Sequence, residues 1–263
     1  MTTALGALAA LAYLLSALRL IQQRQRELDG RGLALSLATL AVLAHLGLQL
    51  VFWRQQGGPD LQFFAALSLV GLGMALLTTG AAAMQRIEAL GIVVFPLSAV
   101  LLTGQLLAGP GKPSSLDWPL QLHAWLALLA YATLAIAAVM AAMLWVQERA
   151  LRRRDLQGWW RALPPLTQLE SLLFRSLAAG FAVLSLALLT GIVFVADLLA
   201  QHLAHKTVLS LLAWVVLAVL LFGRWRWGWR GPRAVKLTLT AMTLLLFAFF
   251  GSKFVLELVL QRA

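Results

Sequence analysis

Eight stretches of the sequence are long, apolar and poor in charge, and they constrain the fold more than any other feature. A helix needs about 20 apolar residues to cross the hydrocarbon core of a bilayer. Such stretches lie at about 3–21, 33–53, 61–84, 89–108, 119–147, 176–198, 207–223 and 236–258. None shows the two-residue alternation of a membrane β-barrel. The sequence therefore predicts an all-α polytopic membrane bundle of about eight transmembrane helices, in one domain over residues 1–263.

The composition agrees with a membrane protein and excludes several kinds of site. Charged residues make up 12% of the chain, whereas soluble domains average about 25%. The chain has no cysteine, which excludes disulfides, thiolate metal sites, iron–sulfur clusters and thioether-linked haem. The opening stretch, MTTALGALAALAYLLSALRL, has no basic segment before its apolar core, so we expect a retained first span.

The distribution of basic residues predicts how the helices are oriented. Sixteen of the 21 Lys and Arg residues fall in one set of loops. The opposite set holds only Arg54, Lys112, Lys206, Lys253 and Arg262. Because Lys and Arg accumulate in cytoplasmic loops, the first set is predicted to be cytoplasmic and both termini to lie outside. The net charge of +11 then reflects topology, and we expect no nucleic-acid binding, since no separate basic domain exists.

Two of the predicted cytoplasmic loops combine arginine with tryptophan. The segment 147–175 is basic and contains Trp159 and Trp160, and the segment 223–233 reads GRWRWGWRGPR. Indole rings favour the depth of the lipid headgroups, and Arg is attracted to anionic lipid. We therefore predict that both segments lie along the membrane surface and contact anionic lipid. A binding site for a partner or ligand is the alternative for 223–233.

The four histidines fall at or near the predicted outer face. His45 lies in the outer half of the second span, His123 opens the fifth, and His202 and His205 precede the seventh. Imidazole is costly in a bilayer unless it is paired, and neutral imidazole is the usual axial ligand of haem iron. Two histidines on different helices could hold one haem from both faces. The alternative is that each histidine makes an interhelical hydrogen bond.

Sequence spacing places one further side chain on the predicted face of each of two histidines. Gln49 lies one turn from His45, and Tyr131 lies eight residues after His123 and is predicted to share its face. Zinc is less favoured, because no carboxylate cluster accompanies the histidines beyond Asp197 and there is no HExxH motif. No acid–base pair or hydrolase set is visible, so we predict that the protein is not an enzyme.

Three stretches of the sequence carry a resemblance to a known family. They read LQLHAWLALLAYATLAIAAVMAAMLWVQERAL at 120–151, LPPLTQLESLLFRSLAAGFAVLSLALLTGIVF at 163–194 and HKTVLSLLAWVVLAVLLFGRWRWGWRGPRAV at 205–235. In order, spacing and eight-span plan they resemble the cytochrome c assembly membrane proteins, and most closely the small HemX-like or YpjD-like branch. The resemblance covers essentially the whole chain and is strongest over residues 119–258.

The resemblance implies haem handling in the bacterial inner membrane, with haem b bound non-covalently near the outer face. His123 matches the histidine that opens the corresponding family helix, His205 stands in the HKT motif of the branch, and His45 takes the place of a membrane histidine. These three are the predicted haem-binding residues, with His123 and His205 as the predicted iron ligands. The tryptophan-rich segment that presents haem in larger members is absent. We therefore expect an accessory of cytochrome c assembly or haem trafficking.

Two other functions stay open on the sequence alone. The chain could be a membrane subunit without haem that stabilises or regulates a partner, such as a transporter or a haem-synthesis enzyme. Its histidines would then be packing residues. A small-solute transporter is less favoured, because the sequence has no repeated pair of broken helices and little intramembrane charge. Under the haem hypothesis, the expected partners are other cytochrome c maturation proteins or another membrane protein.

Overall fold

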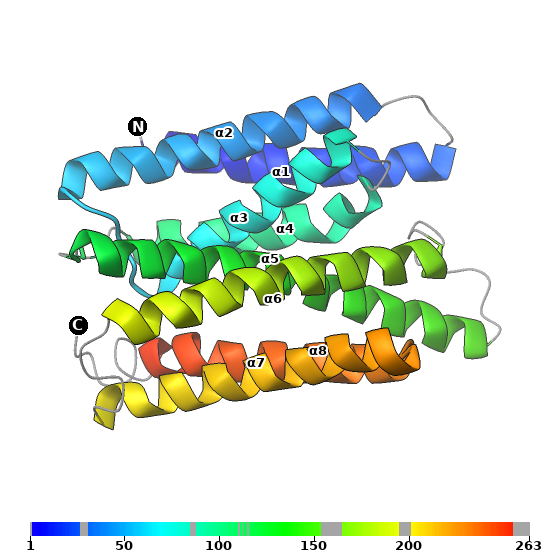
Figure 1. Cartoon of the computed structure of the whole chain (residues 1–263). Coiled ribbons are helices and arrows are strands. Elements are labelled where there is room, and N and C mark those ends of the chain that lie inside the picture. Colours follow the sequence, from blue (N-terminus) through cyan, green and yellow to red (C-terminus); the bar gives the residue numbers. More distant parts are fainter. Residues whose placement is uncertain are drawn as a thin grey trace. The chain divides into compact units, whose positions relative to one another are not determined.

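The described part of the chain is almost entirely helical in the computed structural model (Figure 1). The described residues are 2–26, 31–84, 88–109, 111, 113–114, 116–153, 165–194 and 201–254. Their elements are α1 (Thr2–Arg26), α2 (Arg31–Gln56), α3 (Phe63–Met84), η1 (Glu88–Leu90), α4 (Gly91–Ala108), α5 (Trp118–Arg152), α6 (Leu166–Phe194), α7 (Gln201–Trp227), α8 (Pro232–Leu246) and the π-turn η3 (Phe247–Gly251).

The apolar stretches of the sequence form these helices. Within the described residues, eight helices are long and apolar enough to cross a membrane, which confirms the predicted all-α bundle of eight spans. A helix suits this environment because it satisfies its own backbone donors and acceptors where no water is present. The outward placement of both termini stays a prediction.

The sixth helix begins earlier than the sequence predicted. The predicted span opens at residue 176, whereas α6 opens at Leu166, within the segment expected to lie along the membrane surface. Leu169, Leu173 and Leu177 are buried and recur every four residues, so this stretch continues the inward face of the helix. The predicted span began ten residues later because Glu170 and Arg175 interrupt the apolar run in the first turns of α6. Trp159 and Trp160 lie outside the described residues.

The last helix changes its winding before its predicted end. The predicted span ran from 236 to 258, but the α-helical part of α8 ends at Leu246 and the wider turn η3 follows. Tyr131 on α5 donates a hydrogen bond from its hydroxyl to the carbonyl of Leu245, 2.6 Å away, at this junction. Single π-turns are uncommon and interrupt the regular ladder of α-helical hydrogen bonds. Residues beyond Phe254 lie outside the described part.

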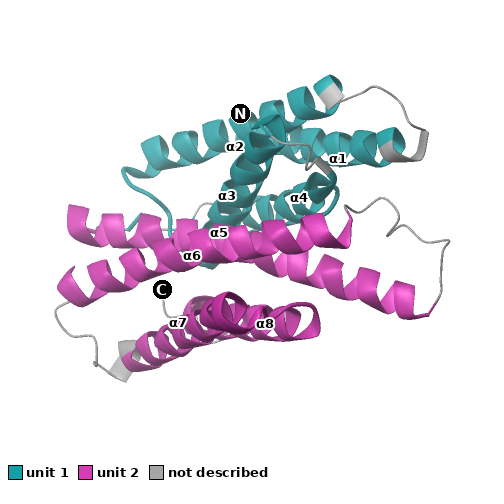
Figure 2. Cartoon of the chain, turned by 45° about the vertical axis from the view of Figure 1, so that its right-hand side comes forward, with its two compact units in different colours: residues 1–115, 161–164 teal, residues 116–160, 165–263 magenta. Residues whose placement is uncertain are grey.

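The chain divides into two compact units by packing (Figure 2). Unit 1 is residues 1–115 with 161–164, and unit 2 is residues 116–160 with 165–263. The sequence predicted a single domain over residues 1–263. That assignment stays a prediction, because the units are defined by contact density within one continuous chain.

Unit 1 contains α1 to α4. In it α1 packs against α2 and α4, α3 packs against α4, and α2 contacts α3. Between membrane helices, small residues let backbones approach closely. The inward face of α2 follows this rule, with buried residues recurring every three or four positions at Ala34, Ala38, Ala41, His45 and Leu48. His45 is therefore placed inside the unit by the same periodicity that places its apolar neighbours.

Unit 2 contains α5 to α8 with η3, and α5 and α6 form its most extensive contact, running antiparallel (Figure 1). Two glycines of α6 receive side chains of α5. A Cβ atom at Gly180 would lie 2.6 Å from Leu134 Cδ2, and one at Gly191 would lie 3.1 Å from His123 Cε1. The two glycines are eleven residues apart, about three helical turns, and so are Leu134 and His123. One register of α5 against α6 therefore seats both side chains.

Candidate functional site

His123 lies near the start of α5, against α6. Its Nδ1 atom is 2.9 Å from the carbonyl oxygen of Ala187 and 3.3 Å from Thr190 Oγ1. A carbonyl oxygen only accepts hydrogen bonds, so Nδ1 carries the proton in this contact. The absence of a side chain at Gly191 brings the ring against the α6 backbone. Helix α6 therefore fixes both the position and the tautomer of this imidazole.

The second ring nitrogen of His123 is available for a ligand. In the neutral ring, a proton on Nδ1 leaves a lone pair on Nε2. Nε2 makes no hydrogen bond within the part of the chain that the structure describes, and the side chain is only partly buried. Metal-ligating histidines commonly donate their other N–H to a backbone carbonyl, which orients the ring. The bond to Ala187 gives His123 this arrangement.

His205 lies at the same end of unit 2 as His123. It stands in the second turn of α7, and both views place the starts of α5 and α7 and the end of α6 at the same end of the unit (Figures 1 and 2). Its side chain is exposed and has no hydrogen bond or ion pair among the described residues. The structure thus brings two predicted site residues, His123 and His205, to one end of one unit. The side chain of His202 is outside the described part.

Aromatic side chains lie at this end of unit 2. Trp118, in the first turn of α5, meets Phe194, the last residue of α6, with ring centroids 6.0 Å apart and planes at 60°. The Trp118 side chain is 71% exposed. Apolar rings at the same end as a partly buried imidazole suit a flat macrocycle, which needs one or two axial donors and apolar cover. No group of three or more metal-ligating side chains occurs in the described ranges, so a site built from several ligands is not indicated there.

His45 belongs to unit 1 and differs from His123 in its bonding. Its ring is fully buried, with Nε2 2.9 Å from Ser68 Oγ and Nδ1 3.4 Å from the Tyr13 hydroxyl. The Gln49 amide nitrogen, which only donates, also lies 3.4 Å from Nε2. Both ring nitrogens therefore have hydrogen-bonding partners inside the unit in either tautomer, because the Ser68 and Tyr13 hydroxyls can donate or accept. Iron ligation by His45 would require these hydrogen bonds to be given up.

The bonds of His45 form part of a wider buried polar network. Gln49 donates 2.7 Å to Gln105 Oε1, and Gln105 returns a bond of 3.3 Å to Gln49 Oε1. Ser68 also accepts from Gln49 at 3.2 Å. The contributing side chains come from all four helices of unit 1: Tyr13, His45, Gln49, Ser68 and Gln105. Because buried polar groups are costly without partners, this network favours one arrangement of the four helices.

The surroundings of His45 and His123 are only partly predictable from the sequence. Helical spacing predicts that Gln49 shares the face of His45, which the structure confirms. It does not predict the other residues of the network, Tyr13, Ser68 and Gln105. Only the packing of four helices brings those residues together. The prediction that Tyr131 shares the face of His123 is wrong: His123 contacts α6 and Tyr131 contacts α8. Two positions eight residues apart differ by about 80° of rotation about the helix axis. This rotation is enough for the two side chains to contact different helices.

Comparisons with known proteins identify a matching family and several sequence relatives. The family described as Cytochrome C assembly protein matches residues 33–260. The inner membrane protein YpjD of Escherichia coli (strain K12) is 36% identical over 137 residues, 52% of this chain and 52% of that protein. Protein HemX of Brevibacillus brevis is 29% identical over 131 residues, 49% of this chain and 48% of that protein.

A third relative gives a similar match. An uncharacterized 28.8 kDa protein of Azospirillum brasilense is 36% identical over 143 residues, 54% of this chain and 53% of that protein. The chain therefore spans about half the length of the curated relatives it matches. No solved structure matches it significantly.

Proposed function

The chain belongs to the cytochrome c assembly protein family, and from that membership we propose that it binds haem b non-covalently as an accessory of cytochrome c assembly or haem trafficking. It is a multi-pass protein of the bacterial inner membrane. The proposed site is the end of unit 2 that carries His123 and His205, which is the predicted outer end. The proposed role is binding rather than catalysis.

The hydrogen bond from His123 Nδ1 to the carbonyl of Ala187 carries this proposal. It holds the ring in the tautomer that presents Nε2 as an electron-pair donor, which is what an axial ligand of iron requires. When bound, haem would supply an iron centre with one-electron redox chemistry. The residues of the chain would bind it, orient it and, through Trp118 and Phe194, shield part of it from water.

We propose His205 as the second axial ligand, ahead of His45. His205 shares its end of unit 2 with His123 and its side chain is exposed. His45 is fully buried, and both of its ring nitrogens have hydrogen-bonding partners. The proposed partners are other cytochrome c maturation proteins or another membrane protein at the same face.

Visible spectroscopy of detergent-purified protein tests this function. The wild-type chain should show a Soret band that shifts on reduction, and His123→Ala should lower haem occupancy at least tenfold. His45→Ala serves as the matched control, since it removes a histidine of unit 1 and should leave the spectrum in place. Circular dichroism and gel filtration check that both variants remain folded. An unchanged spectrum in folded His123→Ala, or loss of the band only in His45→Ala, would contradict the proposed ligand.

One observation favours a second function, that of a membrane subunit without haem. The hydrogen bonds of His45 give it a structural role in unit 1, as expected of a packing histidine. The chain would then stabilise or regulate a partner such as a transporter or a haem-synthesis enzyme. Colourless protein from haem-replete cells, together with a stably copurifying membrane protein, would favour this function over haem binding.

A further inference from the structure

We propose that the opposite end of unit 2 binds the headgroup of an anionic phospholipid at a basic–aromatic cluster. The cluster consists of the end of α7, the following turn and the start of α8, held by Glu170 of α6. Its residues are Glu170, Arg224, Trp225, Arg226, Trp227, Trp229, Arg230 and Arg233. It contains no residue of the haem site and does not depend on the proposed haem function.

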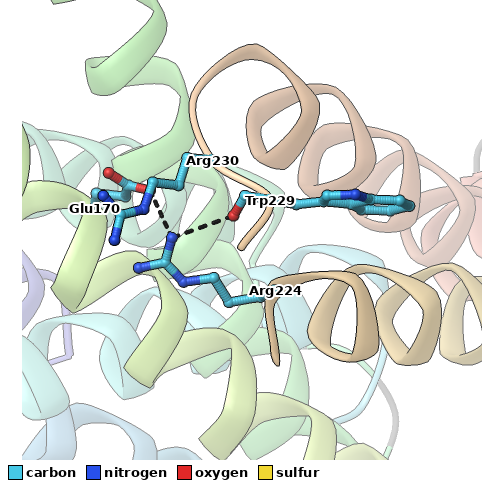
Figure 3. Close-up of polar contacts among 4 residues, drawn as sticks. All are labelled: Glu170, Arg224, Trp229 and Arg230. Carbon is cyan, nitrogen blue, oxygen red and sulfur yellow. Dashed lines mark hydrogen bonds and ion pairs between the residues drawn. The ribbon is translucent and has the colours of Figure 1, made fainter. Parts of the chain in front are cut away.

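A single carboxylate on α6 fixes the cluster (Figure 3). Glu170 Oε1 lies 3.2 Å from Arg224 Nη1 and 3.8 Å from Arg230 Nε. The same Arg224 nitrogen donates to the carbonyl of Trp229 at 3.2 Å. The Arg224 guanidinium also lies over the ring of Phe174, 4.5 Å from its centroid. Arg224 therefore links α6 to the turn after α7. A guanidinium suits this role because it has several hydrogen-bond donors.

The turn itself is ordered by backbone bonds and ring stacking. The Trp229 N–H donates to the carbonyl of Gly223 at 3.2 Å, and the Gly228 N–H donates to the carbonyl of Arg224 at 3.1 Å. The Trp227 and Trp229 rings stack with centroids 5.6 Å apart and planes at 23°. The exposed arginines on either side of this turn, Arg226 in α7 and Arg233 in α8, are consequently presented from an ordered backbone, which lowers the ordering cost of binding.

The cluster has more positive charge than its carboxylates neutralise. Glu170 faces both Arg224 and Arg230, and Glu148 on α5 approaches the turn at Gly231. Arg226 and Arg233 are exposed and have no carboxylate partner among the described residues. Exposed guanidiniums beside a fixed turn favour an anion with several acceptor oxygens, such as a phosphate group.

The surroundings favour a lipid phosphate over a soluble one. Trp225 and Trp227 are 80% and 59% exposed, and indoles at the end of a membrane helix are typical of headgroup depth. An exposed apolar stripe runs along α7 up to the cluster, through Val208, Leu211, Val215, Val219 and Phe222. These residues recur every three or four positions and so share one face. Arg226 follows Phe222 by one helical turn on this face, and Arg233 is tied to the stripe through the rings of Trp229, Trp227 and Phe222. An acyl chain along the stripe would therefore bring its phosphate to the end of α7 that carries these two arginines.

Retention of lipid by the full chain tests the inference. The protein is placed in nanodiscs of phosphatidylcholine with phosphatidylglycerol, re-extracted in mild detergent, and its bound lipid measured by native mass spectrometry. Wild type should be enriched in phosphatidylglycerol at least threefold over the nanodisc composition. The variant R226Q/R233Q should lose this enrichment. The comparison variant R152Q/R153Q removes the same amount of charge from the end of α5, in the segment predicted to lie along the same headgroups but outside the cluster. It should keep the enrichment, because a general surface contact does not retain lipid through extraction.

Each alternative occupant has its own outcome. Equal losses in R226Q/R233Q and R152Q/R153Q would mean diffuse attraction to a charged surface and would overturn the site. Displacement of the lipid by millimolar inorganic phosphate would assign the cluster to a soluble anion. A purified protein that binds the chain in phosphatidylcholine nanodiscs, and no longer binds R226Q/R233Q, would assign it to a protein partner. Retained helix content in both variants excludes misfolding as the cause.

Discussion

Two histidines of this chain differ in how their ring nitrogens are used. In His45, Nε2 is hydrogen-bonded to the Ser68 hydroxyl and Nδ1 meets the Tyr13 hydroxyl. In His123, Nδ1 donates to a backbone carbonyl, and Nε2 has no partner among the described residues. An iron ligand needs a free lone pair on a ring nitrogen. Residue type alone allowed both histidines as ligands, and the hydrogen bonds favour His123.

The buried amide pair of unit 1 gives a prediction at the level of single residues. Gln105→Ala removes both hydrogen bonds to Gln49 and leaves a small cavity. We expect the free energy of unfolding to fall by about 2 kcal/mol, the combined scale of an unsatisfied buried amide and lost packing. Unfolding in mixed micelles measures it. Gln55→Ala, at an exposed position of α2, should change it by less than about 0.5 kcal/mol. Equal effects would argue against the network.

Contacts between pairs of helices position the side chains of α5. The register of α5 against α6 seats His123 at Gly191 and Leu134 at Gly180. On another side of α5, the Tyr131 hydroxyl reaches the carbonyl of Leu245, where α8 changes to the π-turn. A carbonyl at an irregular turn gains from an outside donor, because the regular helical ladder is interrupted there.

Tyrosine-to-phenylalanine variants test this contact between elements. Tyr131→Phe removes a hydrogen bond of 2.6 Å and should lower the free energy of unfolding by about 1 kcal/mol. Tyr13→Phe removes the 3.4 Å contact with His45, a length at which hydrogen bonds are weak, and should cost less. Thermal unfolding in one detergent compares the two. A larger loss in Tyr13→Phe would contradict the expected ranking of these two hydrogen bonds.

The whole molecule combines eight spans with an uneven distribution of basic residues. Sixteen of its 21 Lys and Arg residues lie in the loops predicted to be cytoplasmic. The proposed haem site and the basic–aromatic cluster lie at opposite ends of unit 2, so orientation decides which of them faces the cytoplasm. With both termini outside, haem would be held at the outer face and the cluster would meet the inner leaflet.

Cysteine labelling tests this orientation directly, because the chain has no native cysteine to interfere. Gln55→Cys stands at the end of α2 and Arg153→Cys after the end of α5, both at exposed positions on opposite predicted sides. In spheroplasts, a membrane-impermeant maleimide should label Gln55→Cys at once. It should label Arg153→Cys only after lysis. The reverse pattern would invert the predicted topology and move the proposed haem site to the cytoplasmic face.

The sequence by itself determined the class of fold, the number of spans and the candidate histidines. Length and hydrophobicity are local properties, and about 20 apolar residues in lipid must form a helix because no other donors or acceptors are present. The face of α2 that carries His45 and Gln49 followed from helical periodicity for the same reason. The early start of α6 was missed because Glu170 and Arg175 break the apolar run without breaking the helix.

Only the tertiary structure decided which side chains meet. The partners Tyr13, Ser68 and Gln105 of unit 1, and the carbonyl of Ala187 that sets the His123 tautomer, come from helices distant in sequence. Their meeting depends on the register between helices, which is set by small residues and side-chain volumes at many positions together. The same reason applies to the ion pair between Glu170 and Arg224, which could not be predicted from the sequence because it depends on how α6 and α7 pack.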